Sequence, residues 1–293
     1  MRYTGRLRRS KYVLLGLLAG LVLWCAWGVW QSYHHPVVRE WTADLPRLGA
    51  SVRLAVLSDL HDRDFGGDNR RLAELTASME PDLILLDGDM LNSDSADSSR
   101  VCALVRRLAD IAPVYYAWGN HELEYLARGT SPLEEELTAA GAVVLDRAFV
   151  DLSVDGQLLR LGGLYDYAFA QDDFNTCDPA RMDPAVYGFL SEFQDTDRCR
   201  ILLCHRPDSF VFGAASATWE TELVISGHDH GGQVVLPFLG GVFGGDQGLF
   251  PAYIHGLYEK DGIRLAITSG LGTPREKLPR MWNPPEIMLL NLQ

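Results

Sequence analysis

Side chains that can bind metal ions recur in five short motifs along the chain. The motifs read D-L-H, G-D-M-L-N, G-N-H-E, C-H-R-P and G-H-D-H, and their polar residues are Asp59, His61, Asp89, Asn120, His121, His205, His228 and His230. Carboxylate, amide and imidazole groups together suit Zn, Fe, Mn or Co. In D-x-H and H-x-H the two side chains share one face of an extended segment or splay in the following turn. Each pair can therefore hold one metal or straddle two.

Each motif taken alone has an ordinary structural explanation. D-x-H occurs often by chance, G-D-x-x-N is usually a turn, and G-N-H-E can be a loop that caps a helix. G-H-D-H is a stronger signal, because two histidines between an apolar run and glycines are costly to bury without partners. All five motifs occur in one chain, each directly after an apolar run, and this conjunction favours a metal site over five unrelated turns.

The apolar runs before the motifs predict the strands that would position them. Strands are expected at 53–61, 81–89, 113–122, 200–208 and 221–230, with two more at 263–270 and 286–292. Helical spacing predicts helices at 69–80, 98–111 and 133–146, the last of which leads into a strand. Strands that alternate with helices indicate an α/β fold, in which sites form beyond the carboxyl ends of the strands. We therefore expect the five motifs to converge.

The ordered motifs between residues 59 and 230 resemble those of the calcineurin-like metallophosphoesterase family. SDLHDRDFGGDNRRL, SGHDHGGQ, IHGLY, SGLGT and PPEIMLLNL extend the resemblance to a membrane-anchored bacterial branch of that family. The resemblance implies an α/β fold of two packed mixed β-sheets flanked by helices, a calcineurin-like four-layer sandwich. It also implies two divalent or trivalent metal ions, and the sequence does not distinguish Mn, Zn and Fe.

The resemblance also implies a role for each motif residue. Two sets of three side chains would each hold one metal: Asp59, His61 and His230 for the first, and Asn120, His205 and His228 for the second. Asp89 would bridge the two metals. His121 would face the substrate phosphate or protonate the leaving oxygen. Glu122 and Asp229 either orient histidine ligands or are solvated acids.

Two metals bridged by a carboxylate suit hydrolysis at phosphorus. Two cations about 3.5–4 Å apart clamp an in-line displacement, and a water between them loses its proton easily to give a hydroxide nucleophile. His121 can stabilise the developing charge or act as a general acid. We expect a metal-dependent phosphohydrolase that cleaves a phosphodiester or pyrophosphate bond. The alternatives are a lipid-linked nucleotide-sugar pyrophosphatase of the UDP-diacylglucosamine type, a metallo-amidase or other hydrolase, and a catalytically silent metal-binding scaffold.

The N-terminus has the pattern of a membrane anchor. Residues 1–11 carry five positive charges and no acid, and residues 12–31 are uncharged and almost wholly apolar. Twenty helical residues span about 30 Å, enough to cross a bilayer core. Tryptophans cluster at the far end, as aromatic belts do. We expect a single-pass membrane protein with a cytoplasmic N-terminus and an extracytoplasmic catalytic domain. A signal sequence that is cleaved later is the alternative.

These features divide the chain into three parts. Residues 1–33 form the basic tail and signal-anchor, residues 34–50 a linker or first strand, and residues 51–293 the metallophosphoesterase domain. Five of the 26 Lys and Arg precede residue 34, which leaves 21 against all 39 acids, a formal charge of −18. So acidic a domain argues against nucleic-acid binding. The five cysteines include no C-x-x-C pair, and a Cys177–Cys199 bridge is left open.

Basic residues other than the motif histidines are candidate contacts to a substrate phosphate. Arginine donates in pairs from a planar fork, which suits phosphate oxygens. Arg280 is preferred, and the others are Arg206, Arg275, Lys277 and His255. The glycine-rich and aromatic stretch 237–253 either forms a rim near the bilayer that receives a lipid tail or packs as a loop on the core.

Overall fold

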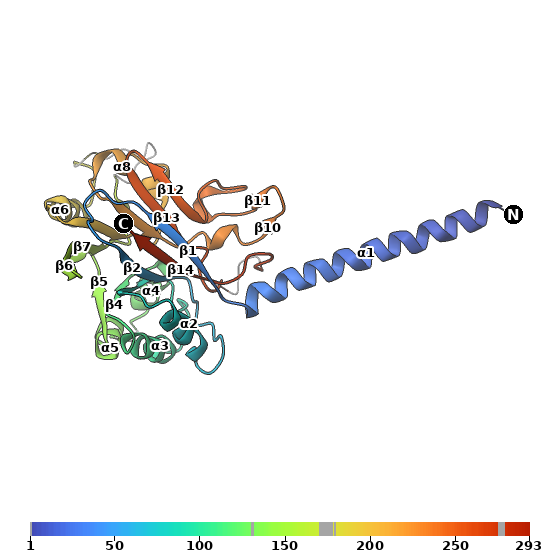
Figure 1. The fold of residues 1–293 in the computed structure, drawn as a ribbon, viewed down its shortest axis with the longest axis horizontal. Coiled ribbons are helices and arrows are strands. Elements are labelled where there is room, and N and C mark those ends of the chain that lie inside the picture. The colour runs from blue at the N-terminus through green and yellow to red at the C-terminus, as the bar shows by residue number, and fades with distance from the viewer. Residues whose placement is uncertain (1, 130–131, 170–177, 179, 275–278) are drawn as a thin grey trace.

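Two β-sheets pack face to face in the computed structural model (Figure 1), which describes residues 2–129, 132–169, 178, 180–274 and 279–293. Helices lie against the outer face of each sheet, so the described part of the chain has four layers. The mixed α/β fold expected from the sequence is confirmed.

The first sheet has the strand order β1-β14-β2-β3-β4-β5. Strands β2 to β5 run parallel, β14 is antiparallel to β2, and β1 is parallel to β14. The strand β3 is buried along its whole length, as apolar strands in parallel sheets usually are. The bounds are β1 Val37–Ala43, β2 Val52–Leu57, β3 Leu83–Asp87, β4 Val114–Ala117, β5 Ala142–Leu145 and β14 Glu286–Leu292.

The second sheet has the strand order β12-β13-β9-β8-β7-β6. Strands β7, β8, β9 and β13 are parallel, and the edge strands β6 and β12 are antiparallel to their neighbours. The bounds are β6 Ala148–Val154, β7 Gln157–Gly163, β8 Cys199–Leu203, β9 Leu223–Ser226, β12 Gly256–Lys260 and β13 Ile263–Ile267. A separate antiparallel pair joins β10 (Val235–Leu236) to β11 (Gly240–Gly241).

Helices cover each sheet through their apolar faces. Helices α2 to α5 pack on the first sheet with side chains such as Leu72, Leu104 and Leu137, and α6 to α8 pack on the second with Phe189 and Phe210. The inner faces of the two sheets meet in a third apolar cluster. The bounds are α2 Arg70–Ser78, α3 Ser99–Ala109, α4 Asn120–Ala127, α5 Leu133–Ala140, α6 Pro184–Gln194, α7 Asp208–Val211 and α8 Ala215–Thr218, with 3₁₀ turns at His230–Gly232 and Gly245–Gln247.

Every strand predicted from an apolar run is present, but the five that precede motifs end before the motif begins. Asn120, His121 and Glu122, which were predicted to lie in a strand, instead begin helix α4. Strands β2, β3 and β4, which precede D-L-H, G-D-M-L-N and G-N-H-E, belong to the first sheet. Strands β8 and β9, which precede C-H-R-P and G-H-D-H, belong to the second. The convergence therefore takes place at the junction of two sheets, which the strand pattern alone did not indicate.

The N-terminal helix α1 (Arg2–His34) extends away from the sheets (Figure 1). An 18-residue window within its segment Lys11–His34 has a mean hydropathy of 2.1 and is only 6% buried, so the helix is long and apolar enough to cross a membrane. Residues 37–43, expected to be a linker or first strand, form the edge strand β1. The helix therefore leads into the sheet through a very short connection.

The last turns of α1 pack against the loop that precedes β14. The rings of Trp24 and Trp282 lie 4.8 Å apart between centroids, and the main-chain N–H of Trp282 donates to the Gly28 carbonyl at 3.1 Å. The main-chain N–H of Asn283 donates to Ser32 Oγ at 3.0 Å. The helix is thus fixed to the domain by ring packing and by hydrogen bonds.

Gly28 is required for this close approach. A β-carbon at position 28 would lie 2.5 Å from Nε1 of Trp282, whereas one at Gly20 would meet no atom within 4 Å. We predict that Gly28→Val lowers the thermal midpoint of the detergent-solubilised protein by roughly 5 °C, because overpacking costs about 1–3 kcal/mol. Gly20→Val, the matched control in the same helix, should leave it unchanged. Equal midpoints for the two variants would contradict the docking.

Candidate metal centre

The polar residues that follow the five strands lie together at the junction of the two sheets. Three groups of side chains have ligand atoms within 4.8 Å of one another, and neighbouring groups share His61 or Asp89. The loops after β2 and β3 are joined by main-chain bonds, with Asp59 N–H donating to Gly88 O and His61 N–H to Asp89 O, both at 3.0 Å. The sequence prediction that the motifs converge is confirmed.

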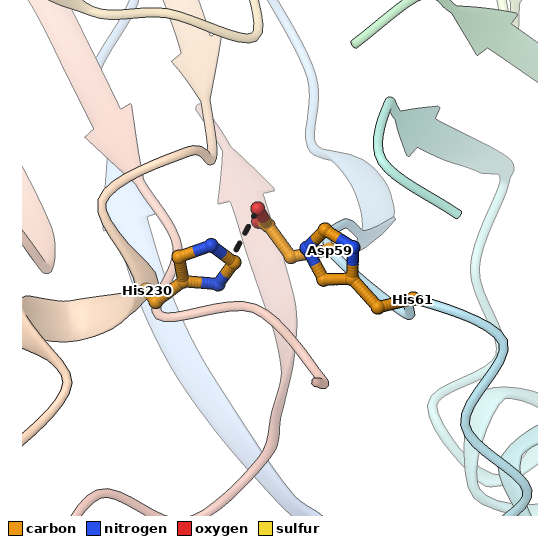
Figure 2. A group of neighbouring side chains, drawn as sticks. All are labelled: Asp59, His61 and His230. Atoms are coloured by element: carbon orange, nitrogen blue, oxygen red, sulfur yellow. Dashed lines mark ion pairs between the residues drawn. The ribbon is translucent and has the colours of Figure 1, made fainter. Parts of the chain in front are cut away.

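The first group contains Asp59, His61 and His230. Figure 2 shows the two imidazole rings on either side of the carboxylate, with His230 Nδ1 3.6 Å from Asp59 Oδ1. The ring centroids of His61 and His230 are 5.2 Å apart. All three side chains are buried. This is the set that the family resemblance implies for one metal.

The second group contains Asp89, His205 and His228. His205 Nε2 lies 3.4 Å from Asp89 Oδ2, and His228 Nδ1 lies 3.1 Å from Asn120 Oδ1. Asp89 is also 3.8 Å from His61 Nε2 through the same Oδ2 atom, so one carboxylate faces both groups. This position between the two groups is the one expected of a bridging ligand.

The backbone turns sharply at five of the candidate ligands. Asp59, His61, Asp89, His228 and His230 all have positive φ, between 48° and 69° for the first four and 47° for the last. Such left-handed conformations cost a non-glycine residue about 1–2 kcal/mol each, and they persist only where the surroundings impose them. The strand ends are therefore bent to aim side chains from two sheets at one place.

Glycines in the motifs allow the loops to approach each other. A β-carbon at Gly119 would lie 2.2 Å from Asp89 Oδ1, and one at Gly227 would lie 2.2 Å from Ser58 Oγ and 2.5 Å from Asp59 Oδ2. The glycine that begins G-N-H-E and the one that begins G-H-D-H are therefore needed for packing against the carboxylates of the other loops.

His205 shows that the site fits a metal ion. Its Nδ1 lies 2.6 Å from the carbonyl oxygen of Asp87, which can only accept, so Nδ1 carries the hydrogen. Its Nε2 faces Asp89 Oδ2 at 3.4 Å and Asp59 Oδ1 at 3.9 Å. These distances are long for a charge-assisted hydrogen bond. The 3.4 Å separation between His205 Nε2 and Asp89 Oδ2 suits two ligand atoms that would each lie about 2.0–2.2 Å from one shared ion.

The pKa values of Asp59, Asp89 and His205 reflect their burial and the charges around them. Burial raises the pKa of Asp59 above its usual range, and the charge of Asp89 adds to this effect. Burial also opposes ionisation of Asp89, but His205, His61 and His121 outweigh it and hold that pKa well below its usual range. Burial disfavours a charged His205, yet the facing carboxylates hold its pKa well above the usual value. A bound cation would take the place of that proton.

Glu122 supports the bridging carboxylate. It is fully buried and accepts hydrogen bonds from the N–H groups of Asp89 (2.7 Å), Met90 (2.8 Å) and Gly119 (2.9 Å), and from the Tyr116 hydroxyl (2.7 Å). The interpretation of Glu122 as a solvated acid is wrong, and so is the alternative that it orients a histidine directly. It fixes the main chain around Asp89 instead.

Asp229 is likewise not a solvated acid. It is 2% exposed, lies between His228 and His230 in the chain, and accepts a hydrogen bond from Gln247 Nε2 at 2.6 Å. It therefore ties the G-H-D-H turn to the segment around Gln247.

His121 is only partly buried, with 13% of its side chain exposed. Its Nε2 is 3.9 Å from Asp89 Oδ2, and its Nδ1 accepts a hydrogen bond from the Ser93 N–H at 3.0 Å. Because Nδ1 is the acceptor, Nε2 carries the hydrogen and can donate toward the site. A cavity of about 730 Å³ opens beside His61 and is lined by Asn92, Arg100 and Thr273, among others.

Arg280, the preferred substrate contact, does not face this site as a donor. The side chain is completely buried, and its guanidinium donates to the carbonyls of Ser269, Gly270, Gly272 and Asn283 at 2.8–3.2 Å. A further bond to Asn283 Oδ1 engages the fifth N–H. The prediction that Arg280 binds substrate is wrong, because its donors hold the turn that packs against Asp59.

The other candidate contacts have different surroundings. His255 Nε2 lies 2.5 Å from Glu286 Oε2, at the start of β14, so this ring faces an internal carboxylate. Arg206 follows His205 directly; it pairs with Asp208 at 3.1 Å and stacks over Tyr167. Substrate contact by Arg206 stays a prediction. Arg275, Lys277 and Cys177 lie outside the described residues.

Several supporting residues were not found from the sequence. Ser93 fixes His121 through its main chain, which leaves no side-chain signal. Asn92, the last residue of G-D-M-L-N, donates from Nδ2 to the His61 carbonyl at 3.1 Å. Asn283 donates from Nδ2 to the His230 carbonyl at 2.6 Å across 53 residues of sequence. The motif could have indicated Asn92, whereas nothing in the sequence pattern indicated Asn283.

Comparison with known proteins identifies the family. The model of the calcineurin-like phosphoesterases matches residues 52–232, more than half of the chain and all five motifs. The chain therefore belongs to the calcineurin-like phosphoesterase family, a class of metal-dependent phosphohydrolases. The family expected from the motifs is confirmed.

The individual proteins that this chain resembles share less than 30% sequence identity with it. An uncharacterized metallophosphoesterase of Campylobacter jejuni is 27% identical over 88% of this chain, and the match spans 63% of that protein. The uncharacterized metallophosphoesterase YkuE of Bacillus subtilis is 29% identical, with 82% and 79% covered. The phosphodiesterase YaeI of Escherichia coli is 28% identical, with 76% of each chain covered. The chain thus spans less than two thirds of the Campylobacter relative.

We predict that Arg280→Met acts on stability and not on substrate affinity. It removes several charge-assisted hydrogen bonds of about 1.5–3 kcal/mol each from a buried position. The thermal midpoint should fall by roughly 10 °C. Among molecules still folded, the KM for a phosphodiester should be unchanged.

Arg264→Met is the matched control, because Arg264 forms a surface ion pair with Glu259. Its thermal midpoint should stay close to that of the unmodified protein. A normal midpoint for Arg280→Met with a strongly raised KM would restore the role of Arg280 as a substrate contact.

Proposed function

We propose that this protein is a dinuclear metal-dependent phosphohydrolase that cleaves a phosphodiester or pyrophosphate bond. The observation that carries the proposal is the position of Asp89. Its carboxylate lies 3.4 Å from His205, 3.8 Å from His61 and 3.9 Å from His121, and so faces both ligand groups and the candidate acid at once.

The two metals would be held as the family resemblance implies. Asp59, His61 and His230 would hold one, Asn120, His205 and His228 would hold the other, and Asp89 would be shared by the two sets. The metals supply Lewis acidity to the phosphoryl oxygens and lower the pKa of water at the site. Mn, Zn and Fe all suit these ligands.

The residues of the chain supply orientation and proton transfer. His121 presents Nε2–H, because Ser93 holds Nδ1 as an acceptor. From its partly exposed position this N–H binds a phosphoryl oxygen or protonates the leaving oxygen. Glu122 holds the loop that carries Asp89, so the carboxylate needs little reorganisation during the reaction.

A diester or pyrophosphate substrate is favoured over other classes. A relative named as a phosphodiesterase aligns with three quarters of the chain. The cavity beside His61 has room for groups on the far side of the phosphate. A lipid-linked nucleotide-sugar pyrophosphate is the second candidate, because Asn283 bonds both to Ser32 of the apolar helix α1 and to the metal-binding loop at His230.

We propose that α1 is a retained membrane anchor, with the N-terminus in the cytoplasm and the catalytic domain outside. Its basic N-terminal flank supports this orientation. Its contacts with Trp282 and Asn283 support retention, because removal of the helix would expose Trp282 and leave the Asn283 N–H without its acceptor.

The proposal predicts metal-restored diester cleavage by the full chain in detergent. The protein is stripped of metal and assayed on bis-p-nitrophenyl phosphate and on p-nitrophenyl phosphate, with Mn, Zn, Fe and Co returned singly. Cleavage of the diester should exceed cleavage of the monoester. Asp89→Asn should lose both bound metal and activity, because its amide cannot bridge two cations as a carboxylate does.

His121→Gln separates catalysis from metal binding. It should keep the metal content while kcat falls by about 10²–10⁴-fold. Normal turnover in both variants would refute the proposal. A folded, metal-loaded protein that cleaves neither these esters nor lipid-linked pyrophosphates would instead indicate the silent scaffold.

A further inference from the structure

Four large apolar side chains are exposed on one segment beside the site. Phe238, Leu239, Leu249 and Phe250 are 106%, 63%, 71% and 56% exposed. Phe238 and Leu239 form the turn between β10 and β11, and the Phe250 N–H donates to the Val242 carbonyl next to β11. We call residues 234–250 the apolar hairpin. So much apolar surface on a small segment marks an interaction site.

The apolar hairpin is attached to the loop on which α1 is docked. Val234 pairs with Met281, the Val235 N–H donates to the Met281 carbonyl at 2.9 Å, and the Met281 N–H donates to the Gln233 carbonyl at 3.2 Å. The next residue, Trp282, packs on Trp24 of α1. Figure 1 shows β10 and β11 on the side of the domain from which α1 emerges.

Charge distinguishes this segment from the rest of the domain. Residues 234–250 contain one charged residue, Asp246, in a domain whose formal charge is −18. An anionic membrane surface would repel most of such a domain. A nearly uncharged segment that exposes two phenylalanines and two leucines suits the region between headgroups and acyl chains.

We propose that the apolar hairpin is a second membrane contact, which inserts Phe238, Leu239, Leu249 and Phe250 into the leaflet from which α1 emerges. The proposal rests on the insertion of α1 proposed above and adds a contact that α1 alone does not require. The partner of this surface is the lipid bilayer, because the apolar hairpin is joined to the anchor helix. It pairs with Met281, and the neighbouring Trp282 packs on α1.

The base of the apolar hairpin is joined to the metal centre. Gln247 Nε2 donates to Asp229 Oδ2 at 2.6 Å, and a β-carbon at Gly245 would lie 3.4 Å from His228 Nε2. Insertion of the hairpin tips would therefore hold the site at the membrane surface. A phosphodiester or pyrophosphate whose apolar part stays in the bilayer could then reach the site without leaving the membrane.

The test measures membrane depth in the full chain, reconstituted into phosphatidylcholine nanodiscs that contain brominated lipid. A fluorescent amino acid, acridonylalanine, is placed singly at Phe238, at Phe250, at Leu23 in α1, or at Tyr187 on α6. Leu23 and Tyr187 are both exposed, and α6 lies on the side of the domain away from α1 (Figure 1). Thermal unfolding of each labelled protein confirms that it is folded.

We expect strong quenching by brominated acyl chains at positions 23, 238 and 250 and none at 187. Quenching at 23 without quenching at 238 and 250 would overturn the hairpin contact while leaving the membrane anchor intact. Absence of quenching at position 23 as well as at 238 and 250 would overturn both the membrane anchor and the hairpin contact. A protein that keeps metal-dependent diester cleavage in either case would show that the chemistry stands apart from the membrane contact.

Discussion

The structure depends on the burial of two carboxylates beside one another. Asp59 and Asp89 are essentially inaccessible to solvent, and the charge of Asp89 raises the cost of ionising Asp59. Uncompensated, such a pair would destabilise the fold by several kcal/mol. Cations bound at this position would remove the conflict. The left-handed backbone at five candidate ligands and the closely packed glycines let two sheets bring these side chains together. The two buried carboxylates that call for cations therefore also form the site for chemistry at phosphorus.

The loop before β14 connects the membrane helix to that site. Asn283 donates its main-chain N–H to Ser32 of α1 and its side-chain amide to the His230 carbonyl. Arg280 donates its main-chain N–H to the Tyr33 hydroxyl, and its guanidinium holds the 269–272 turn, whose Leu271 N–H donates to the Ser58 carbonyl beside Asp59. Hydrogen bonds therefore link the docked end of α1 to the two loops that carry Asp59 and His230.

Much of the fold and the convergence of the candidate ligands could be predicted from the sequence, because apolar runs and the motifs after them are local signals. The apolar runs predicted that strands end just before Asp59, Asp89 and His228. They did not predict how these strands divide between two sheets, because strand pairing is set by contacts between distant segments. Arg280 was misassigned because a buried arginine that binds carbonyls has the same sequence signal as one that binds phosphate. Only its surroundings distinguish the two.

Electron paramagnetic resonance of the Mn²⁺-loaded full chain would decide whether two metals share Asp89. With metal content measured on the same sample, we expect two Mn²⁺ per chain and the broad spectrum of an exchange-coupled pair. In Asp89→Asn the coupled spectrum should disappear. One Mn²⁺ per chain, or two that give only the six-line spectrum of isolated ions, would refute a shared Asp89.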